Sequence, residues 1–181
     1  MSSLDKVNIS INQFGKKQLY SVDHGRGVIH LLQALCNVQS MHLAIQKTDK
    51  LFPTRLESML VFQNFVELEY ESVGRGTWLM EFLHCVPNQK KLMLASYVGG
   101  FRTLPNEVPL CLLFHLEEIK ISSFCGDIQM FGMVGYFLNH ASVLEKLIVI
   151  IFVQSEKQRV NILEELLSLP KNSKECQVLT L

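Results

Sequence analysis

The chain has 181 residues, of which 48% are hydrophobic and 19% are charged. This length and apolar fraction suffice for one domain or one repeat array with a packed core, and they exclude a disordered chain. Lys and Arg together equal Asp and Glu at 17 each, so the formal net charge is zero and no global basic field exists to attract nucleic acid.

The cysteines, the N-terminus and the longest apolar run bear on the cellular compartment. The five cysteines include no Cys-x-x-Cys pair, so we expect reduced, mostly buried thiols. The first residues lack the apolar core of a signal peptide. The longest apolar run, 147–153, is far shorter than the ~20 residues that span a bilayer, and we interpret it as a strand buried on both faces. These features predict a cytoplasmic or nuclear protein that does not contact a membrane.

One strand pattern recurs along the chain: an apolar residue, two residues, an apolar residue, one residue and a third apolar residue. A looser first copy is Leu4-x-x-Val7-x-Ile9. The next five copies lie 27, 24, 27 and 28 residues apart, counted between their middle positions Met41, Leu68, Leu92, Ile119 and Leu147. Leucine-rich repeats have periods of about 20–29 residues. Only Gln89, which opens the copy around Leu92, departs from the apolar rule.

The segments between these strands have helical periodicity. Three sets of apolar residues each share a helical face: Val28, Leu31, Leu32 and Leu35; Trp78, Leu79, Phe82, Leu83 and Val86; and Met130, Met133, Val134, Phe137, Leu138 and Ala141. A last helix is predicted over 156–169, with Ser155 as a possible N-cap and Pro170 just beyond its end. Segments 49–64 and 96–110 show no clear period and are interpreted as irregular connections.

Repetition of strand, helix and strand implies a parallel sheet with helices covering one face. Each unit is too small to bury its own apolar side, so the units must stack into a solenoid. The predicted fold class is therefore α/β, a leucine-rich-repeat solenoid with parallel strands and helices on one face.

Period-2 alternation turns the residues on either side of each middle position away from the core. The column before it is Ser40, Glu67, Lys91, Glu118 and Lys146, and its alternating charges would help to fix strand register. The column after it is His42, Glu69, Met93, Lys120 and Ile148. One interpretation of the second column is a partner-binding strip around Met93, Lys120 and Ile148. The other is an ordinary solvated sheet face.

Two Gly-Arg-Gly triplets, centred on Arg26 and Arg75, each precede a predicted helix at the same rim of the array. They are interpreted either as turns that use the conformational freedom of glycine or as a basic rim for an acidic partner.

Motifs of known catalytic centres do not occur: there is no nucleophile elbow, phosphate-binding loop, dinucleotide fingerprint or zinc-protease motif. The pairs His84–Cys85 and Cys111–His115 could each begin a metal site, but no second pair has matching spacing. We therefore expect no enzymatic activity, no metal and no cofactor.

Several ordered motifs point to one family. They are Val108-Pro109-x-Cys111-Leu112-Leu113, Phe124-x-Gly126, Tyr136-Phe137-Leu138-x-x-Ala141, and the closing Glu165–Pro170 with Cys176-Gln177-Val178. This half of the chain resembles the FBD domain. Upstream, Gly76-x-Trp78 with Phe82-Leu83-x-Cys85, and Leu31-Leu32-x-Ala34-Leu35, are similar to the leucine-rich-repeat region that precedes FBD in plant F-box proteins. The resemblance implies a repeat region over 1–105 and an FBD segment over 106–181 that continues and caps the array.

The resemblance also implies a role. Plant F-box/FBD/LRR-repeat proteins are thought to be substrate-recognition subunits of SCF-type ubiquitin ligases, in which the F-box binds the adaptor. The implied function is a non-catalytic module whose partner is a protein. Residues 1–27 are strand-like and Gly-rich rather than F-box-like, so adaptor binding is not expected of this chain alone. The alternative is a truncated or degenerate structural or assembly protein with no ubiquitin ligase link.

Overall fold

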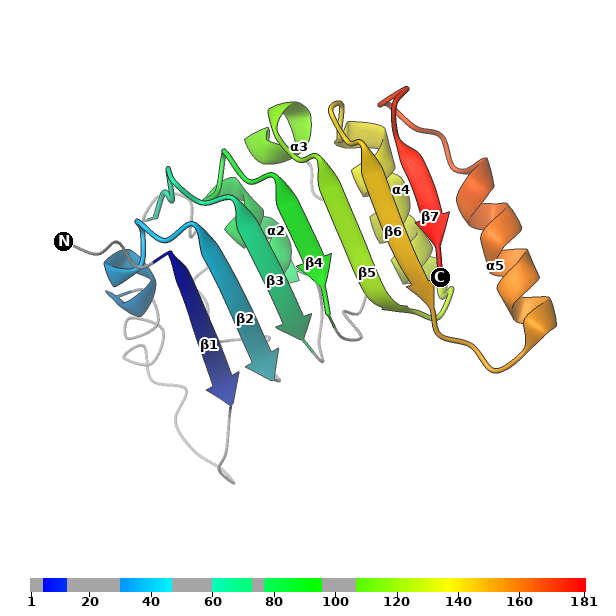
Figure 1. The fold of residues 1–181 in the computed structure, drawn as a ribbon, viewed down its shortest axis with the longest axis horizontal. Coiled ribbons are helices and arrows are strands. Elements are labelled where there is room, and N and C mark those ends of the chain that lie inside the picture. Colours follow the sequence, from blue (N-terminus) through cyan, green and yellow to red (C-terminus); the bar gives the residue numbers. More distant parts are fainter. Residues whose placement is uncertain (1–4, 13–29, 47–59, 73–76, 96–106) are drawn as a thin grey trace.

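The computed structural model describes residues 5–12, 30–46, 60–72, 77–95 and 107–181. These residues form one seven-stranded sheet, in which every neighbouring pair is parallel and the strands follow chain order (Figure 1). The strands are β1 (Lys6–Asn12), β2 (Ser40–Gln46), β3 (Glu67–Ser72), β4 (Lys91–Leu94), β5 (Glu118–Phe124), β6 (Lys146–Ile151) and β7 (Gln177–Thr180). The helices whose bounds lie within the described residues are α2 (Thr77–His84), α3 (Leu110–Phe114), α4 (Ile128–His140) and α5 (Glu156–Ser168), and residues 30–34 are also helical.

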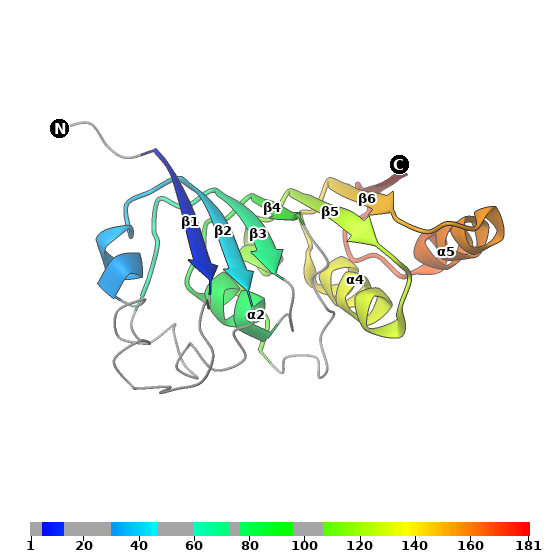
Figure 2. The ribbon, with the colours of Figure 1, turned by 90° about the horizontal axis from the view of Figure 1, so that it is seen from below.

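The helices and the sheet form two layers. Figure 2 shows α2 and α4 on one side of the sheet, while α5 lies beside the C-terminal edge next to β7. The opposite side carries no described helix. The predicted α/β solenoid, with parallel strands and helices on one face, is confirmed.

The predicted core positions lie on neighbouring strands in register. Val7 pairs with Met41, and the pairing continues in one line through Leu68, Leu92, Ile119, Leu147 and Val178. The five members from Met41 to Leu147 are at most 1% exposed. The looser first copy around Val7 is therefore a true member of the array, and β7 adds a seventh.

A repeated hydrogen-bond pattern fixes this register at the amino-terminal ends of the strands. The carbonyl oxygen of Val66 accepts from the backbone N–H groups of Lys90 and Lys91, at 2.8 and 3.0 Å. The residues that act in the same way toward the next strand are Asp5, Gln39, Lys90 and Glu117. Because one carbonyl holds two consecutive amides, a one-residue slip would break bonds at each junction, and it would turn every core side chain to the opposite face.

The centre of the helix-covered core is aromatic. Phe82 of α2 lies 5.5 Å from Phe62 and 5.8 Å from Phe65, measured between ring centroids. Trp78 stacks on Phe82 at 5.1 Å and on Tyr70 of β3 at 5.8 Å. These separations are those of favourable aromatic pairs, each of which adds about 0.5–1.5 kcal/mol beyond its buried area. The apolar face predicted for α2 is therefore what attaches this helix to β3.

The turn between β5 and α4 explains the Phe-x-Gly motif. Phe124 packs edge to face on Phe131, with centroids 5.2 Å apart. Gly126 has φ +75°, and a Cβ at this position would lie 2.6 Å from the side chain of Ile162 in α5. Asp127 then caps α4, because its carboxylate accepts from the N–H of Met130 at 2.8 Å. Glycine is thus favoured by the positive φ, and any larger residue would also require the Ile162 side chain of α5 to move.

The last helix begins as predicted and ends one residue earlier than predicted, at Ser168. Helix α5 covers Glu156–Ser168, and Ser155 occupies the N-cap position without a side-chain hydrogen bond.

The interpretation of 147–153 as a strand buried on both faces is wrong. Burial in β6 alternates along the strand, and Phe152, just beyond it, is 77% exposed. Ile148 and Ile150 therefore belong to the side of the sheet without helices.

Two further expectations need correction: the apolar face around Leu31 and the irregular segment before α3. Leu31 is 45% exposed, whereas Leu32 is buried and Leu35 is half-buried, so the predicted helical face is only partly right; Val28 lies outside the described residues. The interval 96–110 was expected to be irregular, yet α3 begins at Leu110. Residues 47–59 and 96–106 lie outside the described part of the chain.

Candidate functional site on the bare sheet face

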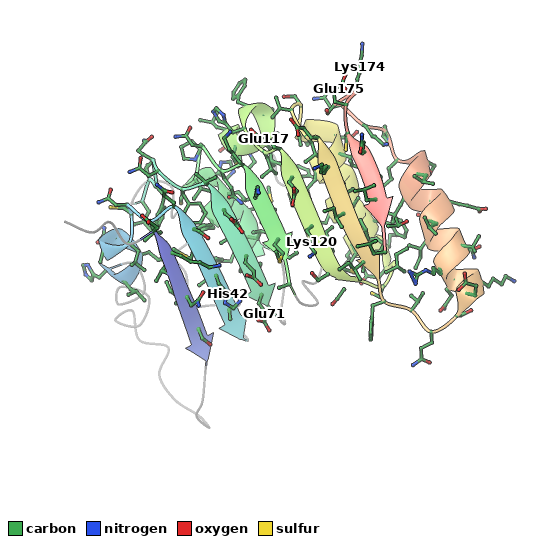
Figure 3. All side chains as sticks on the ribbon, viewed as in Figure 1. His42, Glu71, Glu117, Lys120, Lys174 and Glu175 are labelled. Atoms are coloured by element: carbon green, nitrogen blue, oxygen red, sulfur yellow. The ribbon has the colours of Figure 1, made fainter. Side chains whose placement is uncertain are left out.

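The side of the sheet without described helices, here called the bare face, carries three rows of outward side chains that run across the strands. The first outer row is Lys6, Ser40, Glu67, Lys91, Glu118, Lys146 and Gln177, and the middle outer row is Asn8, His42, Glu69, Met93, Lys120, Ile148 and Leu179. The third outer row, given by the same alternation, is Ser10, Ala44, Glu71, Ala95, Ser122, Ile150 and Leu181, and the register between β5 and β6 shifts just beyond Ile121. From β2 to β6 the members of these rows are half-buried or exposed, whereas the residues between them are buried. Figure 3 shows this face with all described side chains.

Three of the predicted site residues are brought together. Met93 on β4 pairs with Lys120 on β5, which pairs with Ile148 on β6. All three are half-buried, and Lys120 is labelled near the middle of the face in Figure 3. The line continues to Leu179 on β7, which is 43% exposed. Arg26 and Arg75 lie outside the described residues, and the partner-binding role of all five residues stays a prediction.

Charge is concentrated on β3, where Glu67, Glu69 and Glu71 all point to the bare face. Glu71, near the carboxyl end of β3, forms an ion pair with His42 of β2, with 3.7 Å between Oε2 and Nε2, and Figure 3 labels both residues. Lys91 is the lysine in register with Glu67. The β3 carboxylates therefore form a locally acidic zone on a protein whose overall formal charge is zero.

The predicted ladder of alternating charges has the expected register. Glu67, Lys91, Glu118 and Lys146 follow one another across four strands. These four residues are all described, and none of them forms an ion pair shorter than 4.0 Å. A close pair occurs one position earlier, between Nζ of Lys90 and Oε1 of Glu117 at 2.8 Å. The ladder therefore acts through longer-range, solvent-screened attraction.

Ionisable groups on the helix-covered side are held in their neutral forms. Burial raises the pKa of Tyr70 and the pKa of the Cys111 thiol to about 12 each. Neither group offers an anionic nucleophile near neutral pH. Within the described ranges, no three His, Cys, Asp or Glu side chains gather closely enough to hold a metal ion. Among those same residues, no helix has the length and apolar character to cross a bilayer.

These features define a class of protein. An in-register stack of short parallel strands, with helices on one face and side-chain rows on the other, is the architecture of leucine-rich-repeat proteins, whose long open face serves protein interaction.

Comparison with known proteins gives the family. Residues 104–149 match the FBD family model. An FBD-associated F-box protein of Arabidopsis thaliana is 37% identical over 132 residues, covering 70% of this chain and 27% of the relative. A putative F-box/FBD/LRR-repeat protein is 31% identical over 84% of this chain and 34% of its own length, and another FBD-associated F-box protein is 32% identical over 97% and 40%; both are also from Arabidopsis thaliana.

The chain is therefore a relative of the plant F-box/FBD/LRR-repeat proteins, which confirms the resemblance seen in the sequence motifs. It spans about a quarter to two fifths of the length of these curated relatives. No solved structure matches the chain. The FBD match runs through α3, β5 and α4 into β6, so Lys120 and Ile148 lie inside it and Met93 lies before it.

The sequence motifs missed part of the bare face. The outward columns read from the sequence stop one step short of Glu71 and Ile150, and they omit β7 with Leu179 and Leu181. Continuing the period-2 alternation by two residues would have found the third outer row. The pairing of His42 with Glu71 had no sequence signal, because the two residues lie in different rows and become neighbours only through strand packing.

Proposed function

We propose that this chain is a non-catalytic protein-interaction module that recognises substrate proteins for an SCF-type ubiquitin ligase. The bare sheet face is its binding surface. The observation that carries the proposal is the in-register middle outer row, in which Met93, Lys120, Ile148 and Leu179 lie on four consecutive strands. The kinship with proteins named for their F-box and FBD segments supports the ubiquitin ligase link.

The backbone makes this row a firm platform. Strands β4, β5 and β6 are each hydrogen-bonded to a neighbouring strand on both sides, and β7 is bonded to β6. The residues that alternate with the row, such as Leu147 and Ile119, are fully buried. Side chains presented from such strands lose little further freedom on binding, which favours affinity. Four strands at ~4.8 Å spacing present about 14 Å of surface from Met93 to Leu179.

Lys120 is the charged residue of the platform. Its register partners on both sides, Met93 and Ile148, are apolar. Among the residues that the structure describes, Lys120 has no ion-pair partner within 4.0 Å. An apolar flank lowers the local dielectric and strengthens the pull of the ammonium group on a partner's carboxylate or carbonyl oxygen. Lys120 therefore orients a partner that the flanking side chains hold by apolar contact.

The cellular setting follows from the same proposal. We place the chain in the cytoplasm or the nucleus, where ubiquitin ligases act. Adaptor binding is not assigned to this chain, because the F-box carries that contact in the family.

Affinity purification with matched variants tests the proposal. The full chain and three variants, Lys120→Glu, Ile148→Asp and Lys174→Glu, are used as bait in plant extracts prepared with a proteasome inhibitor. Lys174 is the control because it is exposed in the turn before β7, at the rim of the array (Figure 3). We expect proteins that bind the wild type and Lys174→Glu but neither face variant, and whose abundance rises when the chain is silenced. Two results would contradict the proposal: equal capture by all four baits, or captured proteins whose abundance does not change when the chain is silenced.

A further inference from the structure

The bare face changes character along the stacking direction. At β3 it carries the acidic strip, defined as Glu67, Glu69 and Glu71. At β6 and β7 it carries the apolar patch, defined as Ile148, Ile150, Leu179 and Leu181. Met93 and Lys120 lie between the two zones. The two ends of one continuous surface therefore favour different chemical groups.

The acidic strip has more negative than positive charge. Its carboxylates sit on alternate residues of one strand, about 6.6 Å apart along β3. Lys91 is in register with Glu67, and His42 is 3.7 Å from Glu71. Glu69 lies between His42 and Met93 in its row. Lys91 does not neutralise all three carboxylates. A basic side chain of a partner placed over Glu69 and Glu71 would therefore be attracted by their negative charge.

The apolar patch exposes large side chains on two adjacent strands. Leu179 and Leu181 are 43% and 63% exposed, and Ile148 and Ile150 are half-buried beside them. Leu181 is held next to β6, since its N–H donates to the carbonyl of Val149 at 3.0 Å. Grouped exposed aliphatic residues on a folded surface mark an interaction site more often than scattered ones do.

The separation of the zones sets the length of a ligand that reaches both. From β3 to β6 is three strand spacings and from β3 to β7 is four, or roughly 14–19 Å at ~4.8 Å each. An extended peptide advances about 3.3 Å per residue. Four to six residues therefore cover the distance.

We propose that the bare face binds an extended segment of a partner protein that carries basic side chains at one end and large apolar side chains four to six residues away. The segment crosses the strands, with its basic end on the acidic strip and its apolar end on the apolar patch. Lys120 and Lys146 on β5 and β6 repel the basic end from the wrong half of the face, which fixes the direction of the segment. This inference rests on the proposed function, because it takes the bare face as the binding surface and names the chemistry of its partner.

Peptide selection tests the inference without knowledge of the natural partner. A phage library of random 12-residue peptides is selected on the immobilised full chain and on two double variants, Glu69→Gln/Glu71→Gln and Ile148→Ser/Leu179→Ser. Glu175→Gln, in the rim turn labelled in Figure 3, is the matched charge control. Thermal unfolding by circular dichroism verifies that each variant folds, which is expected because the substituted side chains point away from the core.

We expect the wild type and Glu175→Gln to select Lys or Arg followed or preceded by Leu, Ile, Phe or Met at a spacing of four to six residues. The glutamine double variant should lose the basic enrichment and keep the apolar one, and the serine double variant should do the reverse. A synthetic peptide of the selected sequence should bind Glu69→Gln/Glu71→Gln at least tenfold more weakly in fluorescence anisotropy. Its binding to the wild type should weaken as salt is raised, because charge attraction is screened.

Other outcomes separate the two proposals. Selected peptides that depend on Lys120 and Ile148 but show no paired basic and apolar residues would overturn the inference and leave the bare face as the binding surface. Peptides that bind every bare-face variant equally would overturn both proposals. Concentration-dependent dimers in sedimentation velocity, lost in Ile148→Ser/Leu179→Ser, would assign the apolar patch to a second copy of the chain and so overturn the inference.

Discussion

The two faces of the sheet follow different rules along the stack. On the helix-covered face, from β2 to β6, the middle positions are apolar and at most 1% exposed, from Met41 to Leu147. On the bare face the same strands pass from the acidic strip on β3 to the apolar patch on β6 and β7. From Met41 to Leu147 the middle positions keep one register, with a shift only toward the carboxyl ends of β5 and β6, so the difference between the faces lies in the side chains. Stacking constrains every second residue, and the residues between them are available for recognition.

The largest expected effect contrasts two adjacent residues of β6. Leu147 is 0% exposed and Ile148 lies on the bare face. Leu147→Ala should lower the free energy of unfolding by about 2–5 kcal/mol, because it leaves a cavity in the core. Ile148→Ala should cost less than about 1 kcal/mol and should weaken partner binding instead. Urea titration measures the first effect and anisotropy the second; equal losses of stability would erase the distinction between the faces.

The turn that fixes α5 against the helix-covered side gives the next effect. Gly126→Ala should destabilise by about 2 kcal/mol, because a left-handed conformation costs an L-residue roughly 1–2 kcal/mol and the new Cβ would lie 2.6 Å from Ile162. Gly132→Ala is the matched control. Gly132 lies in α4, where an added Cβ meets nothing within 4 Å, and the change should stabilise by about 0.5–1 kcal/mol. A loss at Gly132 as large as that at Gly126 would show that packing against Ile162 is not the cause.

The neutral groups beneath the sheet predict instability in alkali. Burial raises the pKa of Cys111 from 9.0 and that of Tyr70 from 10.0 to about 12 each. Above the unfolded pKa the unfolded chain releases these protons while the folded chain retains them, so stability falls as pH rises from about 9 to 12. Each group contributes a slope of up to about 1.4 kcal/mol per pH unit. Urea titrations at several pH values should show that the free energy of unfolding falls less steeply with pH in Cys111→Ala than in the wild type. An unchanged dependence on pH would mean that Cys111 is not a cause of the instability.

Gln89 departs from the apolar pattern of the five copies from Met41 to Leu147. It is 0% exposed, and its Nε2 donates to the carbonyl of Lys91 at 2.9 Å while its Oε1 has no hydrogen-bond partner. Gln89→Leu should stabilise by about 1 kcal/mol, since it removes a buried unsatisfied acceptor and restores the repeat. The gain would appear as a higher urea midpoint, with an unchanged dependence of the unfolding free energy on urea concentration. Destabilisation would mean that the bond to Lys91 outweighs the unsatisfied oxygen.

The smallest effect is expected at the rim. The hydrogen bond and charge of Glu117 raise the pKa of Lys90, but both side chains are more than a third exposed, and exposed pairs contribute little. Lys90→Gln should change stability by no more than the error of a urea titration. Any contribution is fully present below the unfolded pKa of about 10.5 and is lost as pH rises through the folded value. A clear loss of unfolding free energy in Lys90→Gln at neutral pH and physiological salt would show that this rim pair stabilises the fold more than a screened, exposed ion pair can.

The sequence predicted the helix-covered face better than the bare face. Strand register followed from the recurring core residues, and the apolar faces of α2 and α4 predicted those helices, because burial leaves a periodic signal. The five-residue helix α3 is too short to show such a period. The run 147–153 was misjudged because Ile148 and Ile150 are apolar on a surface. Hydrophobicity alone does not distinguish a core position from one in an apolar patch.

The site was predicted in part for the same physical reason. Met93, Lys120 and Ile148 were found because alternation from a core residue gives the direction of its neighbours. The acidic strip lies on one strand and follows from the same alternation continued to Glu71, whereas the contribution of β7 and the contact between His42 and Glu71 depend on which strands are adjacent. That information comes from the stacking of the repeats, which a single repeat does not contain.

Photo-crosslinking most directly tests the claim that the bare face is the recognition surface. A photoreactive phenylalanine analogue is placed in turn at Met93, at Ile148 and at Val160, the last being a 44% exposed apolar residue of α5 away from the strands. With the selected peptide or a captured partner, we expect crosslinks from positions 93 and 148 and none from position 160. Crosslinks from position 160 alone would contradict the assignment of recognition to the bare face.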